Sequence, residues 1–160
     1  MPLSLTDFSA YLGAWAQKYE NQFKLYYPLK GGWEAWVQTS VAGYIINDNS
    51  TIDILREQLI FYGAQQKVDW LLNDADQSVT NKIAIELKCQ SIENQKNFTS
   101  GLEADIAKLA DANLKVAYRG CRRAVVGICF TSDALQWMGT KNFKILHKTD
   151  ETAIGLAPLN

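Results

Sequence analysis

Two helical patterns open the chain. Apolar residues recur three or four positions apart between Thr6 and Pro28, which predicts an amphipathic helix that begins at Thr6-Asp7 and ends before Pro28. A second helical pattern covers residues 33–45, and the turn-forming residues 47–50 are expected to end it.

The next segments have the shorter, denser apolar runs typical of strands. Residues 59–62, 67–73 and 82–90 form three such runs with short connections, which indicates an antiparallel meander. The helical spacing returns at residues 102–114, and a continuous apolar strand is predicted at residues 123–130. A short helix over residues 131–137 and a last strand over residues 143–147 complete the pattern. The order α-α-β-β-β-α-β-α-β predicts an α/β fold with a mixed sheet flanked by helices, and no linker or repeat divides residues 1–160, so we expect one domain.

Composition excludes several classes of protein. The 160 residues are 48% hydrophobic and 21% charged, which is close to the globular average and excludes a disordered tail or a coiled coil. The apolar runs are too short to cross a membrane, and the first residues carry no secretory signal. The three cysteines are an odd number without C-x-x-C spacing. We therefore expect a cytoplasmic protein with buried, reduced thiols and no membrane partner.

The charge is unevenly distributed although the net charge is only −1. Residues 107–149 contain eight basic side chains and two acidic ones, giving +6 there, so the rest of the chain carries −7. This segment could present a basic face to a polyanion, or its charges could simply be solvated. The candidate nucleic-acid contacts are Lys108, Arg119, Arg122 and Arg123.

The predicted strand over residues 82–90 carries the strongest chemical signal. Side chains alternate between the two faces of a strand, so Glu86, Lys88 and Gln90 share one face, about 6–7 Å apart in succession. This strand is expected to lie centrally in the sheet. Burying charges there is costly unless they are paired or bind a metal.

A single aspartate, Asp69, interrupts the preceding apolar strand. An antiparallel neighbour would bring Asp69 beside Glu86, and a divalent cation, Mg²⁺ or Mn²⁺, would remove the repulsion between the two carboxylates. Lys88 could then orient or deprotonate a water, or neutralise charge in a transition state. The alternative is a structural ion pair of Lys88 with Glu86 or Asp69 on a half-exposed strand.

Three other residues have open assignments. Asp105 and Lys108 lie one helical turn apart, and they form a surface pair, orient Lys88 or contact a phosphate. His147 is the single histidine, and a strand or surface position is favoured over a general base.

The combination of Asp69 in the second strand with Glu86-Leu87-Lys88 in the third resembles the PD-(D/E)xK nuclease superfamily, which has the restriction-endonuclease-like fold. Members of that family have a helix, three antiparallel strands, a second helix and a further strand. Many also carry a glutamate on the preceding helix, where Glu34 stands here, and some continue the motif with the glutamine matched by Gln90. The resemblance covers roughly residues 31–130. Val68 replaces the proline of the literal P-D motif.

The resemblance implies a metal-dependent nuclease that cuts DNA. It implies that Asp69, Glu86, the Leu87 carbonyl and Glu34 hold Mg²⁺ or Mn²⁺, and that Lys88 positions the attacking water, with Gln90 completing the site. Two alternatives stay open. One is a module that has kept the fold, lost catalysis and binds nucleic acid or protein. The other is a nuclease toxin, which would have an immunity protein as partner. A homodimer is a further expectation, since many such nucleases cut both strands as dimers.

Overall fold

A computed structural model describes residues 1–63 and 65–159 of the chain. The helices and strands follow one another in the order α1 (Leu5–Tyr26), α2 (Glu34–Asp48), β1 (Ile54–Gln58), β2 (Val68–Leu72), β3 (Ile83–Cys89), α3 (Phe98–Lys108), β4 (Arg122–Cys129), α4 (Ser132–Thr140), β5 (Lys144–Lys148) and β6 (Ala153–Leu159). Three short 3₁₀ turns lie in the connections before β3 and before β4.

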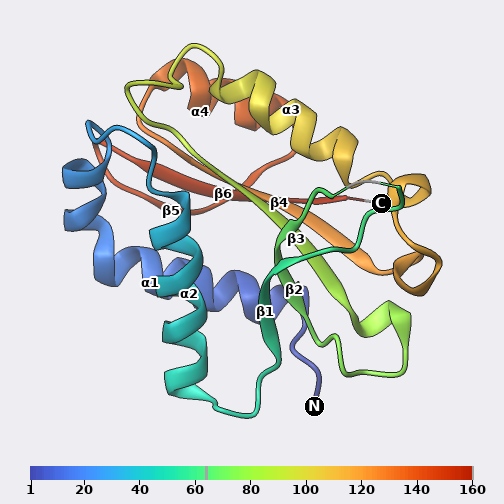
Figure 1. Cartoon of the computed structure of the whole chain (residues 1–160). Coiled ribbons are helices and arrows are strands. Elements are labelled where there is room, and N and C mark those ends of the chain that lie inside the picture. Colours follow the sequence, from blue (N-terminus) through green and yellow to red (C-terminus); the bar gives the residue numbers. More distant parts are fainter. Residues whose placement is uncertain (64, 160) are drawn as a thin grey trace.

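The strands form one six-stranded sheet in the order β1-β2-β3-β4-β6-β5 (Figure 1). Strands β3 and β4 pair in parallel, with α3 in the crossover between them, and the other neighbours pair antiparallel. The predicted α/β architecture with a mixed sheet flanked by helices is therefore confirmed.

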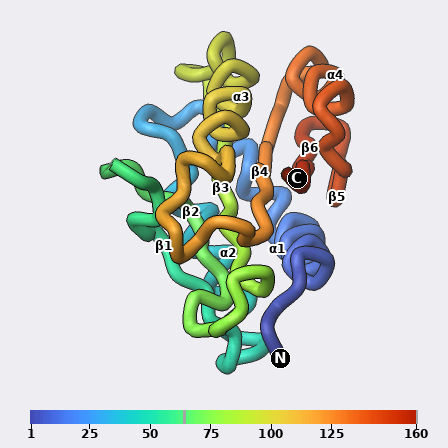
Figure 2. The backbone as a smooth tube through the Cα atoms, turned by 90° about the vertical axis from the view of Figure 1, so that its right-hand side faces the viewer, coloured from blue at the N-terminus to red at the C-terminus, as the bar shows by residue number. Residues whose placement is uncertain are grey.

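The helices cover the two faces of the sheet in pairs. Helices α1 and α2 lie on one face, and α3 and α4 lie on the other (Figures 1 and 2). The strand β3 serves both layers, because Ile83, Ile85 and Leu87 face the α1–α2 core while Ala84 faces the α3–α4 core. This alternation is the one that the sequence predicts, and it turns Glu86 and Lys88 toward the α3 side.

The first strand lies earlier in the chain than the sequence predicts. Residues 59–62 are not a strand. Ile60 and Phe61 are buried in the α3–α4 core, and Phe61 makes an isolated bridge with Leu114. The true edge strand β1 is mostly polar, because an edge strand has one side in solvent and needs no apolar run.

The sequence pattern also misses the last strand, β6, which inserts between β4 and β5. Gly155 and Pro158 interrupt its strand pattern. Strand β5 pairs with β6 only as far as Leu156, so at Pro158 strand β6 has β4 as its one neighbour. A residue without a backbone N–H is tolerated at such a position, because no strand on the other side needs its hydrogen bond. The observed order therefore has one more strand than predicted.

Two expectations drawn from composition can be compared with the structure. Cys89, Cys121 and Cys129 are all buried and unpaired, as predicted. Within residues 1–63 and 65–159, none of the helices has the length and apolar character needed to cross a membrane.

Candidate functional site

The pairing of β2 with β3 stops in the middle of the sheet. Its last pair is Trp70 with Ile85, and the next residues along the two strands are Asp69 and Glu86. The Asp69 carboxylate occupies the gap that follows. Its Oδ2 atom accepts a hydrogen bond from the Leu87 backbone N–H at 2.6 Å. The N–H and C=O of one extended residue point to the same strand edge, so the Leu87 carbonyl faces the same gap.

Glu86 is the most deeply buried charged side chain of the motif, with 3% of its surface exposed. Lys108 Nζ lies 2.9 Å from each carboxylate oxygen, and Oε2 accepts its hydrogen bond, whereas Oε1 is buried without one. Burial, followed by the charge of Asp69, raises the pKa of Glu86 to about 8 despite Lys108. The protein therefore holds this carboxylate in a state that a further cation would stabilise.

Lys88 lies between two other carboxylates. Its Nζ atom is 3.5 Å from Glu34 Oε1 and 3.7 Å from Asp105 Oδ2. Burial lowers the pKa of Lys88, but the charges of Glu34, Asp105 and Asp69 outweigh burial, so the net shift is upward. Lys88 is thus an ammonium at neutral pH, which suits a cation and hydrogen-bond donor better than a base.

Glu34 reaches the site from the first turn of α2. Trp33 fixes this turn by donating its indole N–H to the Gln90 carbonyl at 3.0 Å, and both Trp33 and Trp36 pack on aromatic rings of α1. The glutamate between the two tryptophans therefore turns toward β3, where it meets Lys88 and the Cys89 N–H at 3.4 Å. Burial raises the pKa of Glu34, and Lys88 opposes that shift.

Helix α3 supplies the remaining charges. Asp105 and Lys108 do not form a surface pair, because Asp105 pairs with Lys88 and Lys108 pairs with Glu86. The Asp105 side chain is 13% exposed, and its Oδ2 atom is buried without a hydrogen bond. Burial raises the pKa of Asp105 in turn. The site thus gathers four acidic side chains around two ammonium groups, and a divalent cation bound there would favour the ionised carboxylates.

Gln90 makes its side-chain hydrogen bonds to the turn between β4 and α4. Its side chain is 1% exposed, its Oε1 atom accepts from the backbone N–H groups of Phe130 and Thr131, and its Nε2 atom donates to Thr131 Oγ1. The amide therefore joins the end of β3 to the turn between β4 and α4. None of the hydrogen bonds of the Gln90 side chain goes to a carboxylate of the motif or to Lys88.

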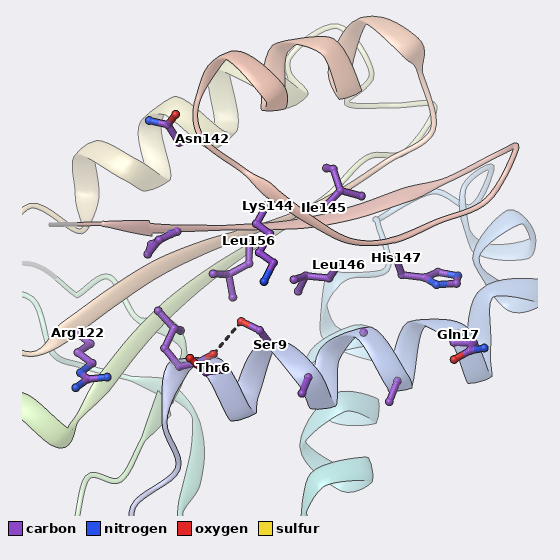
Figure 3. Close-up of a pocket in the computed structure, with 15 residues that line it drawn as sticks. Thr6, Ser9, Gln17, Arg122, Asn142, Lys144, Ile145, Leu146, His147 and Leu156 are labelled. Carbon is purple, nitrogen blue, oxygen red and sulfur yellow. Dashed lines mark hydrogen bonds between the residues drawn. The ribbon is translucent and has the colours of Figure 1, made fainter.

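The candidate nucleic-acid contacts differ in what their side chains contact. Arg123 donates to the Leu109 carbonyl at the end of α3, and Arg119 donates to the Leu114 carbonyl. Arg122 is exposed and lies on the α1 side of the sheet (Figure 3). Lys108, Arg119 and Arg123 thus all bond to groups of the protein itself, around the end of α3 and its connection to β4.

A cleft of about 850 Å³ lies between α1 and β5, on the side that Arg122 borders (Figure 3). Lys144, Leu146 and small residues of α1 line it, and none of the four clustered carboxylates does. His147, at its rim, pairs with Glu20 on α1 and is a strand histidine, as expected. The cleft and the charged cluster are therefore separate features.

The residues of the cluster fit a magnesium ion in type, although they do not form a closed cage. In the part of the chain that the structure describes, no group of three or more His, Cys, Asp or Glu residues is placed to hold a metal ion. Mg²⁺ is usually bound by one or two carboxylates together with water and substrate phosphate. Asp69, Glu86 and the Leu87 carbonyl can supply such an incomplete set, and the buried Oε1 of Glu86 has no hydrogen bond to lose.

Two residues beside Asp69 are not part of the motif, so the sequence resemblance does not predict them. Gln38 of α2 donates to Asp69 Oδ1 at 2.6 Å, and Arg56 of β1 donates to the Gln38 side-chain oxygen. A signal for Gln38 exists in the sequence, since it stands on the buried stripe of α2 four residues before Ala42 and seven before Ile45. Arg56 lies in the polar edge strand and gives no such signal.

No family model, no curated protein and no solved structure matches this chain.

Proposed function

We propose that the protein is a metal-dependent nuclease of the PD-(D/E)xK superfamily that hydrolyses phosphodiester bonds of DNA. The observation that carries the proposal is the gap between β2 and β3. There Asp69 and Glu86 follow the last strand pair, and Lys88 stands two residues further on. A hydrophobic pair would continue the sheet at lower cost, so buried charge at this point calls for a function.

Asp69, Glu86 and the Leu87 carbonyl would hold Mg²⁺ or Mn²⁺. The ion would polarise the phosphate and lower the pKa of a bound water. Glu34 contacts Lys88 and the Cys89 N–H, so it would act on the metal through water.

Lys88 would hold the attacking water and the phosphate oxygens by charge and hydrogen bonding. Its ammonium is already fixed by Glu34 and Asp105, so little reorganisation is needed when charge develops on the phosphate. The oxygen of the water forms the new bond to phosphorus and its proton passes to solvent, the bond from phosphorus to the leaving sugar oxygen breaks, and that oxygen takes up a proton from solvent.

One observation favours a second candidate, an inactive module of the same fold. Lys108 already neutralises Glu86, so the folded chain carries its own cation at one of the two expected metal ligands. A protein that has lost catalysis could keep such a pair as a purely structural device, and bind nucleic acid or protein elsewhere.

A cleavage assay distinguishes the two candidates. The purified chain is incubated with plasmid, single-stranded DNA and RNA, with Mg²⁺, with Mn²⁺ or with EDTA. The nuclease proposal expects cleavage of DNA that EDTA abolishes. Intact substrates under all metal conditions, together with retained binding of nucleic acid or protein, would favour the inactive module.

A further inference from the structure

A partly buried chain of hydrogen bonds leads from the edge strand to Asp69. Arg56 donates through Nε and Nη2 to Gln38 Oε1 at 3.2 and 2.8 Å, and Gln38 Nε2 donates to Asp69 Oδ1 at 2.6 Å. Gln38 itself is 4% exposed. The chain continues through Asp69 Oδ2 to the Leu87 N–H at 2.6 Å.

The chemistry of the partners fixes the orientation of the Gln38 amide. An arginine can only donate hydrogen bonds and an ionised aspartate can only accept them. The amide oxygen must therefore face Arg56, and the amide NH₂ group must face Asp69. A free glutamine could rotate its amide by half a turn, so Arg56 selects the orientation that serves Asp69.

The backbone of Gln38 is anchored as well. Its carbonyl accepts the indole N–H of Trp70 at 3.1 Å, and Trp70 is the residue that follows Asp69 in β2. Helix α2 is thereby held against the strand at the position where the β2–β3 pairing ends. Gln38 is therefore held through its backbone by Trp70 as well as through its side chain by Arg56.

We propose that Gln38 is a positioning residue for Asp69, and that Arg56 acts through it. The inference rests on the nuclease function proposed above and deepens it. On its β3 side strand pairing no longer restrains Asp69, although β1 still pairs with Val68 and Trp70, so the carboxylate needs other restraints to point its free lone pairs at a metal. A carboxylate offers about four lone-pair sites. Gln38 and the Leu87 N–H take one on each oxygen, which leaves one on each oxygen for a cation.

Groups that hydrogen-bond to a metal ligand fix its orientation, and their loss typically costs 10–100-fold in metal affinity or activity. We therefore expect Gln38→Met, which keeps the length of the side chain but removes both hydrogen-bonding groups, to weaken Mn²⁺ binding by about 10–100-fold. The Mg²⁺ concentration that gives half-maximal cleavage should rise by a similar factor. Arg56→Met should act in the same direction.

The double variant tests whether Arg56 acts through Gln38. If it does, Gln38→Met together with Arg56→Met should bind Mn²⁺ no more weakly than Gln38→Met alone. Ser40→Ala is the matched control, because Ser40 lies on the same helix and its hydroxyl accepts the indole N–H of Trp15 at 2.9 Å, away from the site. It removes one side-chain hydrogen bond of α2 and should leave Mn²⁺ binding unchanged.

The measurement is calorimetric titration of Mn²⁺ into the wild type and the four variants, with thermal melts in EDTA to show that each is folded. If the wild type binds Mn²⁺ and Gln38→Met binds it with the same affinity, the inference is overturned and the nuclease proposal is left intact. Equal weakening by Ser40→Ala would also overturn it, since α2 packing would then be responsible. A wild type that binds no Mn²⁺ and cuts no DNA would remove both the inference and the proposed function.

Discussion

The two edges of strand β3 differ, although the same seven residues form both. Toward β4 the strand is paired along its whole length, from Ile83 opposite Arg122 to Cys89 opposite Ile128. Toward β2 it is paired only from Ile83 to Ile85, and charged side chains fill the space beyond. The two edges are therefore closed differently, the continuous one by a neighbouring strand and the interrupted one by charged side chains.

The difference has a physical cause in the partner strands. Strand β4 is almost wholly apolar and buried between two layers of helices, so nothing competes with its backbone hydrogen bonds. Strand β2 carries Asp69, whose carboxylate takes the Leu87 N–H as a hydrogen-bond partner. A buried N–H must find an acceptor, and here a side chain replaces the partner strand.

The largest expected effect lies at the continuous edge. Ile128 is fully buried in β4, and Ile128→Ala should destabilise the protein by about 2–5 kcal/mol through lost burial and the cavity left behind. Denaturant unfolding measures this change. Mn²⁺ affinity of the folded variant should stay at the wild-type value, and a parallel loss of Mn²⁺ affinity would show that the two edges are not independent.

The next effect lies at the interrupted edge. Lys88→Ala should lower the cleavage rate by about 10²–10³-fold, because it removes a preorganised positive charge from the phosphate. Lys141→Ala is the matched control, since Lys141 pairs with Glu103 at a more exposed position on the molecule. Full activity of purified Lys88→Ala would exclude this site as the nuclease centre.

A smaller effect concerns pH. The folded-state pKa of Glu86, raised to about 8, lies above its ordinary value of 4.5, so the folded protein binds the proton more tightly than the unfolded chain. The metal-free wild type should therefore lose stability as pH rises between these two values. Glu86→Gln carries no such charge, so its stability relative to the wild type should increase over the same range in EDTA. If the stability of Glu86→Gln relative to the wild type falls as pH rises, Glu86 is instead the anion of a structural pair with Lys108.

The comparison also shows what the sequence could predict. Alternation along β3 is a local property, so the positions of Glu86 and Lys88 on one face follow from the order of residues alone. The partners of these residues cannot be predicted from the order of residues, because the crossover from β3 to β4 determines which turn of α3 faces the motif. The sequence left the roles of Asp105 and Lys108 open for this reason, and the structure assigns each to one motif residue.

Other features depended on contacts that no local pattern reveals. The hydrogen bonds to Asp69 from Gln38 and from the Leu87 N–H join elements that are distant in the chain. They also change how this residue can be tested, since Asp69→Asn would turn an NH₂ group toward one of two donors and disturb the fold. Glu86, with an oxygen that has no hydrogen bond, is the better position for substitution.

The central claim is that the interrupted edge of β3 binds a divalent cation, and thermal melts in EDTA and in Mn²⁺ test it most directly. At about a hundredfold excess over Kd, binding to the folded state should add about 2.7 kcal/mol of stability to the wild type. The melting temperature of a domain of this size should then rise by roughly 5–10 °C. Glu86→Gln should lose most of this rise, while Glu103→Gln, at an exposed ion pair, should keep it. A wild type whose melting temperature is the same in Mn²⁺ and in EDTA, or a Glu86→Gln variant with an undiminished rise, would contradict the account.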